Sequence, residues 1–546
     1  SVTVATKGLL GKCGCTRMVQ GGYNVALQPG DSVERHFMDT IEGGKWLPDQ
    51  DLAWTLVETA VERVRELENE IGCFFDRNTD GTLHGKAFAG QTFDRTVHKG
   101  DLTGIEIINR LMEQVWARDV GRLEEHRAIA LIPSDDGAEI AGVLFIDIRT
   151  GAFRFVSAKA VLLATGGGPT MYRFHTPSGD KAMDGLSMAF DLGLALRDME
   201  MVQFHPTGML AGPHTRMTGT VLEEGLRGAG GWLINGDGDR FMERYDAKAE
   251  RATRDIVSRA ITSEMLAGRT SPNGGVYIQM SHLGADNVRK QFKGMVDRCA
   301  DSGFNLAEGQ VEVVPTAHYH MGGVVCGTDT STAVPGLFVA GEDAGGVHGA
   351  NRLGGNGVAN STVFGGIAGD TMAAFVTLNP HRRRPDHAAI EQAIDRAHTP
   401  FAAPRGDINA IRTRLLDLMW DDVGILRDEA GLKRAAGELT ALDDELDRTG
   451  VADTDLAFNL TWHDWLNLKS QLAMSKVIAA AALQRENSRG AHYRRDHPDT
   501  GALETSTFTQ ALQGDGDGIR VTSEPVKFTR VQPGETLIDE TLEAAE

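Results

Sequence analysis

The spacing of hydrophobic residues along the chain predicts alternating strands and helices. Residues 2–6 form a short β-branched run, typical of a buried strand. Apolar residues recur at helical spacing from Asp51 to Ile71, and Gly72 is a natural helix stop. A second helix is expected to begin at Thr103, where Thr103 and Glu106 match a capping box.

The β-rich stretches predict the sheet architecture. Residues 129–132, 142–148 and 153–157 predict a β-meander with polar turns. Residues 160–164 and 337–339 are continuous apolar runs that end in glycine-containing loops. Strands buried on both faces belong to a mostly parallel sheet, so the fold class is α/β.

The rest of the chain divides into three further segments. Residues 208–320 are mixed, with a helix expected from Asp255 to Leu266. From about residue 395 the chain becomes helical and more charged, with one clear helix from Leu466 to Gln484. Residues 511–546 are polar and acidic, and we expect an extended arm there.

Glycine is the compositional anomaly, with 65 residues in a chain of 546. It falls in short clusters, which favours backbone lying close to a large ligand, although many tight turns would leave the same pattern. The net charge of −21 argues against a nucleic-acid partner. A small anionic substrate would therefore need cationic groups gathered at its site.

The cysteines and hydropathy bear on location. Five scattered cysteines argue against a disulfide framework, and the Cys13–Cys15 spacing fits no metal site. No run of about 18 apolar residues occurs, so we expect a cytoplasmic protein that does not span a membrane. No signal peptide is visible, and Ser1 is not a natural start, so the true N-terminus is expected to be absent.

Four residues in unusual local settings are the candidate chemical groups: His205, Arg254, His318 and Arg352. Guanidinium forks bind carboxylates bidentately, and imidazoles add hydrogen bonds. Arg254 begins a helix, where the macrodipole disfavours a cation. Taken singly, a histidine beside proline is most often structural, and an arginine beside aspartate is usually a surface ion pair.

The series of motifs taken in order resembles the flavoprotein subunits of succinate dehydrogenase and fumarate reductase, a family that includes L-aspartate oxidase. The resemblance covers residues 2 to about 500. The matching pieces are residues 20–22, 164–167, 203–208, 224–231, 240–245, 253–255, 318–323, 348–356, 489–492 and 494–496.

The resemblance implies roles for matching positions. His205, His318 and Arg352 would bind substrate carboxylates, and Arg254 would donate or accept the proton. Arginine is a poor acid, so it needs a relay, for which Glu224 and Arg227 match. The expected FAD contacts are Lys7, Gln20, Gly21, Gly22, Thr165, Gly166, Gly167, Asp184, Glu342, Asn356, Val358 and Ser361.

The implied architecture is a Rossmann-like FAD-binding domain (1–207 and 321–394), an inserted α+β capping domain (208–320), a C-terminal helical domain (395–510) and the acidic arm (511–546). No G-x-G-x-x-G occurs in the sequence. Residues 2–6 resemble the second strand of such a fold. We therefore expect the first strand, its glycine-rich turn and its helix to be missing by truncation.

Three positions depart from the family pattern. Cys15 stands where membrane-bound members carry the histidine that holds FAD covalently, so non-covalent FAD is expected and fumarate reduction is favoured. Glu223 replaces a threonine that touches substrate, and a charged carboxylate there would repel a dianion. Residues 357–361 also differ from better-known members, whereas Gly354 to Asn356 argue mildly against L-aspartate oxidase.

The expected function is fumarate–succinate interconversion by hydride transfer at flavin N5. No iron–sulfur or heme motif is present, so electrons are expected to pass through a partner iron–sulfur subunit, with membrane contact only through partners. The alternatives are L-aspartate oxidase, a soluble reductase or oxidase of another dicarboxylate, or a flavin-binding assembly protein without turnover.

Overall fold

The parallel strands form two separate pairs. The computed structural model describes residues 1–212, 215, 217–514, 516 and 518–538. In one pair, β1 (Val2–Ala5) runs parallel to β5 (Val120–Leu123). In the other, β9 (Val161–Leu163) runs parallel to β16 (Leu337–Val339). The predicted strands are confirmed, but β1 is exposed rather than buried, because within the described chain it pairs along one edge only.

The β-meander is confirmed and forms an antiparallel three-stranded sheet. Its strands are β6 (His126–Pro133), β7 (Ile140–Asp147) and β8 (Phe153–Ser157). A second small sheet, of β2 (Tyr23–Asn24), β4 (Thr96–Val97) and β3 (Gly85–Lys86), lies near the N-terminal helices. These helices are α1 (Val33–Gly43), α2 (Gln50–Glu66) and α3 (Thr103–Ala117).

The helix at Thr103 exists, but the predicted capping box is wrong. Leu102 is the N-cap residue and has no side-chain capping bond. The Thr103 hydroxyl accepts a hydrogen bond from the Lys99 amide and donates one to the Gly21 carbonyl. Glu106 accepts from the Phe74 amide instead of closing back on the helix start. The hydroxyl therefore ties the helix to the loop at Gly21.

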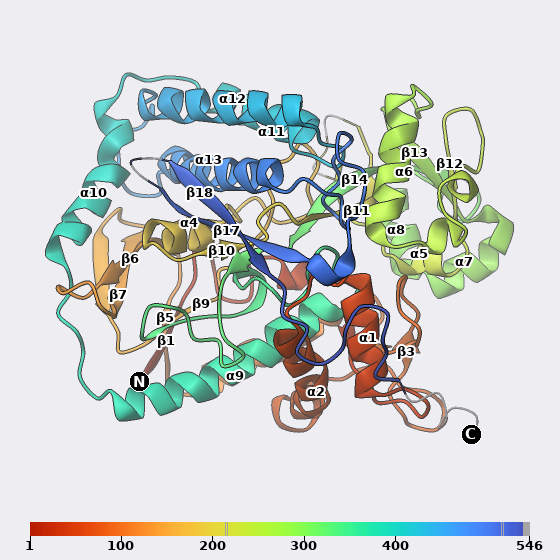
Figure 1. Ribbon diagram of the computed structural model, residues 1–546, viewed down its shortest axis with the longest axis horizontal. Helices are drawn as coiled ribbons and strands as arrows, with labels where there is room; N and C mark the ends of the chain where they lie inside the picture. Colours follow the sequence, from red (N-terminus) through yellow and green to blue (C-terminus); the bar gives the residue numbers. More distant parts are fainter. Residues whose placement is uncertain (213–214, 216, 515, 517, 539–546) are drawn as a thin grey trace.

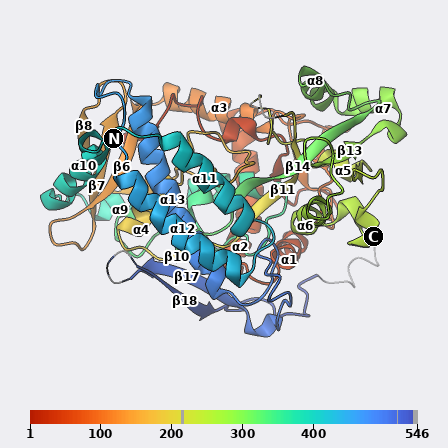
Figure 2. The same cartoon turned by 90° about the horizontal axis from the view of Figure 1, so that it is seen from above.

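The segment predicted as a cap forms a separate layer beside the parallel strands, on the same side in both views (Figures 1 and 2). Its sheet has the order β11-β14-β13-β12, and its helices pack against a shared apolar core. The elements are β11 (Val202–Met209), β12 (Trp232–Ile234), β13 (Val276–Gln279), β14 (Gln310–His320), α5 (Gly225–Gly228), α6 (Arg254–Leu266), α7 (Ala285–Gln291) and α8 (Lys293–Asp301).

The C-terminal helices stack in one layer, with α11, α12 and α13 side by side (Figure 1). They share a core with the meander and with α4 (Asp184–Asp191), to which Leu163, Leu439 and Leu472 contribute. The preceding helices, α9 (Asn356–Leu378) and α10 (His387–Ala402), lie outside this layer (Figure 1). The three stacked helices are α11 (Ile408–Asp422), α12 (Glu429–Asp447) and α13 (Leu460–Gln484). The helix predicted from Leu466 thus starts six residues earlier.

The extended acidic arm predicted from residue 511 is wrong in its first part. Residues Thr507–Gln513 (β17) and Ile519–Pro525 (β18) form an antiparallel hairpin. The hairpin joins β10 (Leu196–Arg197) and β15 (Gly323–Val324) in a four-stranded sheet. Pairing with a distant strand holds this polar segment, which its own composition does not reveal.

Helix α9 qualifies the expectation about membrane-spanning segments. By length and composition alone it is apolar enough to cross a membrane, and 17% of its apolar stretch is buried inside the protein. Its first residue, Asn356, is fully buried and bonds to Asn24, His36 and Thr40. These bonds fix the start of α9 inside the protein.

Candidate active site

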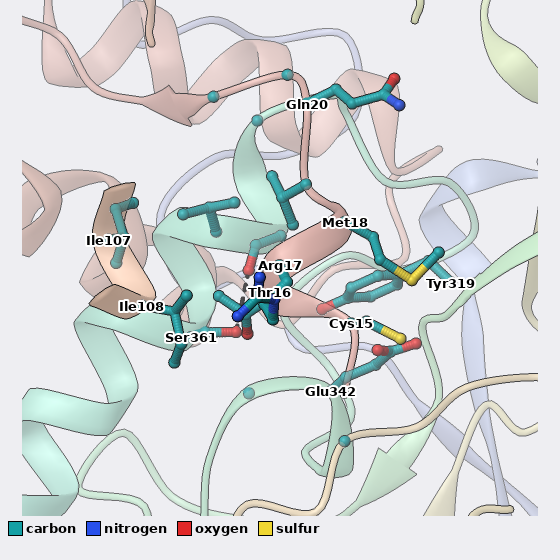
Figure 3. Close-up of a pocket in the computed structure, with 18 of the residues that line it drawn as sticks. Cys15, Thr16, Arg17, Met18, Gln20, Ile107, Ile108, Tyr319, Glu342 and Ser361 are labelled. Carbon is teal, nitrogen blue, oxygen red and sulfur yellow. Dashed lines mark hydrogen bonds between the residues drawn. The ribbon is translucent and has the colours of Figure 1, made fainter. Parts of the chain in front are cut away.

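A cavity of about 930 Å³ lies between the parallel strands, α9 and the cap. Its walls come from residues 15–22, from the loop after β9, from β11 and β14, and from the first turns of α9. Figure 3 shows the part of the wall built by Cys15 to Met18, with Cys15 beside Glu342. Most candidate residues predicted from the sequence therefore surround one space.

The two candidate histidines face each other from neighbouring antiparallel strands. His205 lies on β11 and His318 on β14, with ring centroids 5.3 Å apart. The Thr207 amide donates to His205 Nδ1 at 3.3 Å, and the Thr176 hydroxyl lies 2.7 Å from His318 Nδ1. Because Nδ1 of His205 accepts, its Nε2 carries the proton and is a donor in the neutral ring.

Arg254 begins α6 and is the first member of a buried chain of ion pairs. Its Nη2 lies 2.6 Å from Glu224 Oε2, and Glu224 Oε1 lies 3.2 Å from Arg227 Nη2. Arg227 Nη1 then donates to the Glu250 carbonyl at 2.7 Å. All of these side chains are nearly inaccessible to solvent, so the chain leads from the cavity wall into the cap interior.

Gln203 links the guanidinium group of Arg254 to the backbone of Arg352. Its Oε1 accepts from Arg254 Nη1 at 3.0 Å, and its Nε2 donates to the Arg352 carbonyl at 2.7 Å. The Arg352 guanidinium lies over the Tyr319 ring, 4.3 Å from its centroid, which is a cation–π contact. One amide thus fixes the separation of the two cationic residues.

Burial and neighbouring cations set the charge states. Burial, together with Arg254, holds the pKa of His205 and of His318 well below the ordinary value, so both rings are neutral at pH 7. Burial would raise the pKa of Glu224, but Arg254 and Arg227 outweigh it and the pKa is lowered. Burial and Arg254 lower the pKa of Arg352 to about 10. The cavity therefore presents positive charge and neutral donors.

The predicted cofactor contacts on the wall are Gln20, Gly21, Gly22, Gly166, Glu342, Val358 and Ser361. Gly166 has a left-handed φ of +75°, and a Cβ there would lie 1.9 Å from Lys181 Nζ. A Cβ on Gly167 would lie 2.9 Å from Glu342 Cγ. A side chain at Gly166 would therefore collide with Lys181, and one at Gly167 would collide with Glu342. The first turn of α9 offers backbone N–H groups suited to a ligand's negative charge.

Other predicted contacts lie behind the wall. Lys7 and Asp184 bind each other at 2.7 Å, and Asp184 also pairs with Arg127. Thr165 bonds to Asp343, and Asn356 to side chains of the N-terminal segment. The structure therefore places these four residues as supports of the cavity, and a direct contact with FAD stays a prediction for them.

Sequence reasoning gave no role to Gln203, Tyr319, Thr176 or Lys181. Gln203 and Tyr319 stand inside the motifs around His205 and His318, and that position is the one signal that pointed to them. Thr176 and Lys181 lie in the loop after β9 and line the cavity.

An α/β domain with a cap, and a glycine-walled cavity whose far end holds imidazoles and guanidinium groups, defines a flavoprotein of the oxidoreductase class. Two family models match the chain: an FAD binding domain over residues 1–358 and the fumarate reductase flavoprotein C-terminal region over residues 412–537. The chain belongs to the fumarate reductase flavoprotein family.

Known proteins are similar to this chain over nearly its whole length. A component of the CoM/CoB fumarate reductase of Methanothermobacter marburgensis is 40% identical over 501 residues, 91% of this chain and 90% of that protein. The flavoprotein of E. coli quinol fumarate reductase matches with a TM-score of 0.91 at 29% identity, covering 98% and 93%. Mycobacterium smegmatis Sdh1 matches with a TM-score of 0.85 at 35% identity, covering 96% and 90%.

Proposed function

We propose that this protein is the FAD-bearing subunit of an enzyme that interconverts fumarate and succinate, with fumarate reduction as the physiological direction. The observation that carries the proposal is one cavity, in a protein of net charge −21, that gathers His205, His318, Arg254 and Arg352. Two carboxylates of a C4 diacid match two guanidinium groups and two neutral imidazole donors. FAD, when bound, supplies the hydride.

Arg254 is the proposed proton donor to the substrate. Glu224 is held ionised by two guanidinium groups and accepts a hydrogen bond from Arg254 at 2.6 Å. It would take up a proton from Arg227, 3.2 Å away, and pass that proton to Arg254. Arg227 extends the route toward Glu250. The relay and the roles of His205, His318 and Arg352 in gripping carboxylates are supported by this connected geometry.

The domain boundaries given from the sequence stand as part of the proposal. Residues 208–320 would act as the cap that excludes water during hydride transfer. This segment contacts the N-terminal part of the chain, because Gln20 Nε2 donates to the Val221 carbonyl at 3.3 Å.

We propose that FAD is bound without a covalent link. Cys15 lies on the cavity wall, and burial raises the pKa of its thiol above the ordinary value, so the nucleophilic thiolate is disfavoured. Acid precipitation of the FAD-loaded protein should release all flavin into the supernatant. Flavin that stays with the pellet, but not in the Cys15→Ser variant, would establish a thioether instead.

Electron supply is proposed to come from a separate iron–sulfur subunit, because the sequence carries no iron–sulfur cysteine spacing. Residence in the cytoplasm, with membrane contact only through such partners, belongs to the same proposal.

The deciding experiment is anaerobic stopped-flow mixing of the photoreduced flavoprotein with fumarate. Fast reoxidation of the flavin is expected. Reoxidation by another diacid but not by fumarate would redirect the substrate, and oxidation of aspartate by the oxidised protein would favour L-aspartate oxidase. Binding of FAD without binding of fumarate or malonate would favour an assembly protein.

A further inference from the structure

Glu223 is a carboxyl group on the wall of the cavity, and the nearest partner of its Oε2 atom in the described chain is the Lys86 amine, at 3.6 Å. Glu223 is 7% exposed, and within the described chain its Oε2 has no hydrogen bond. Lys86 Nζ is the cation beside it, at 3.6 Å, and this amine donates to the Gly100 carbonyl at 2.8 Å. A buried polar atom left open toward a cavity is a place for a ligand atom.

The surroundings of Glu223 disfavour its charged form. Burial raises the pKa of the carboxyl, and Asp101, which also lines the cavity, raises it further. Lys86 on β3 and Arg298 on α8 act in the opposite direction without reversing the shift. Its Oε1 lies beside Gly225, where an added Cβ would be 3.4 Å from this oxygen.

Glu224, its neighbour in the chain, shows the contrast. Glu224 is paired with Arg254 and Arg227 and is held ionised, so its charge is neutralised before any substrate arrives. An ionised Glu223, with the Lys86 amine 3.6 Å away, would instead add negative charge to a cavity that must accept a dianion. A neutral carboxyl in the same place has an O–H to donate.

We propose that Glu223 contacts the dicarboxylate as a neutral carboxylic acid that donates its O–H to a substrate carboxylate, so that binding takes up one proton from solvent wherever Glu223 is ionised in the free protein. This inference rests on the proposed function, because it assumes that a dicarboxylate occupies the cavity. It makes Glu223 a determinant of affinity, separate from the proton that Arg254 transfers.

The coupling has a defined pH signature. When the complex requires the protonated group, apparent affinity falls about tenfold for each pH unit above the pKa of that group in the free protein. Below that pKa the affinity is constant and no proton is taken up. The direction is opposite to that expected if an ionised Glu223 gripped a cationic substituent.

The test uses malonate, a dicarboxylate without a reducible double bond, and the FAD-loaded full chain. Calorimetric titration in two buffers of different ionisation enthalpy, from pH 6 to 9, counts the protons taken up. The unmodified protein is expected to take up about one proton per malonate at the upper end of this range. In Glu223→Gln the amide donates without titrating, so proton uptake should fall by about one and the affinity should vary less with pH.

Two further variants make the result specific. Glu243→Gln changes a cap glutamate whose side chain is 66% exposed, and it should behave as the unmodified protein. Lys86→Met removes the cation that favours ionised Glu223, so the pH at which affinity declines should move upward. If Glu223 had a purely structural role, Glu223→Gln would bind malonate more weakly, but its affinity would vary with pH as it does in the unmodified protein.

The inference is overturned if Glu223→Gln binds malonate with the same proton uptake and pH slope as the unmodified protein. That failure is distinguishable from failure of the proposed function. A protein that binds malonate without proton uptake, yet whose reduced flavin reacts with fumarate, keeps its function and loses only the role of Glu223.

Discussion

Two adjacent glutamates on the cavity wall, Glu223 and Glu224, have pKa values shifted in opposite directions because their partners differ. Glu224 contacts two guanidinium groups, whereas Glu223 has one amine 3.6 Å away. The charge of each carboxyl group is therefore governed by the side chains that the fold brings beside it. Chain position alone does not decide it.

Replacing Arg254 with alanine should lower the rate of flavin reoxidation by fumarate about 10²–10⁴-fold, because it removes the proposed proton donor. FAD content and circular dichroism should stay unchanged. Arg251→Ala, an exposed arginine three residues earlier, is the matched control and should keep the rate. An Arg254→Ala protein that still turned over at the control rate would remove Arg254 from the mechanism.

The sequence predicted the imidazole and guanidinium groups that line the cavity and missed the residues that position them. His205, Arg254, His318 and Arg352 stand in motifs, and the cavity brings all four together. Gln203 acts through contacts with residues 51 and 149 positions away, and only the folded chain reveals such contacts. The supporting place of Lys7 was likewise invisible, because it depends on Asp184 lying beside it.

At the scale of the element, α13 illustrates how apolar spacing translates into stability. Leu472 is fully buried against the other C-terminal helices, whereas Leu460, at the start of the same helix, is 70% exposed. Leu472→Ala should lower the free energy of unfolding by about 2–5 kcal/mol. Leu460→Ala should change it by less than about 0.5 kcal/mol. Denaturant unfolding followed by fluorescence measures both, and equal effects would contradict the assigned packing.

The junction between β10, α13 and β17 holds two carboxyl groups against one guanidinium. Asp198 and Glu200 are buried and both bond to Arg485, and Asp198 Oδ1 also accepts from the Thr509 amide. Burial, together with Glu200, raises the pKa of Asp198 above its ordinary value. The folded protein therefore holds a proton that the unfolded chain releases.

Stability should consequently decline as pH rises from the ordinary aspartate pKa through the raised value, and then level off. Asp198→Asn keeps an oxygen to accept these hydrogen bonds and cannot ionise, so its melting temperature should fall less between pH 4 and 8. Asp301→Asn, at an exposed site, serves as the control and should follow the unmodified protein. A steeper decline in Asp198→Asn would contradict this account.

The periodicity of apolar residues predicted where the long helices lie, but it did not predict the hydrogen bonds that the residues at their ends make. The helices at Gln50 and Thr103 are present, yet the Thr103 hydroxyl serves the loop at Gly21 instead of its own helix. The hairpin from Thr507 to Pro525 escaped prediction because its strand pairs with β10, more than 300 residues earlier. Tertiary partners override local patterns at both places.

The whole molecule assembles its cavity from segments that are distant in sequence: residues 15–22, the loop after β9, the cap and the start of α9. A ligand that spans them should stabilise the fold as a unit. FAD added to deflavinated protein should stabilise it by about 2.7 kcal/mol at a hundred times the Kd, seen as a rise in melting temperature. FMN lacks the adenylate half, so at the same concentration as FAD it should give a smaller rise in melting temperature. An equal rise would contradict a cavity-spanning site.

The pairing of β11 with β14 also sets the distance between the groups that would bind the two substrate carboxylates. Both imidazoles stand on paired strands, whose register shifts beside Gln203 and beside His205. Gln203 on β11 bonds to both arginines and so relates their positions to each other. The gap between the gripping groups is therefore built into a sheet, which adjusts far less than a loop. Diacids with one methylene more than succinate should be rejected because the strands cannot move apart to accommodate them.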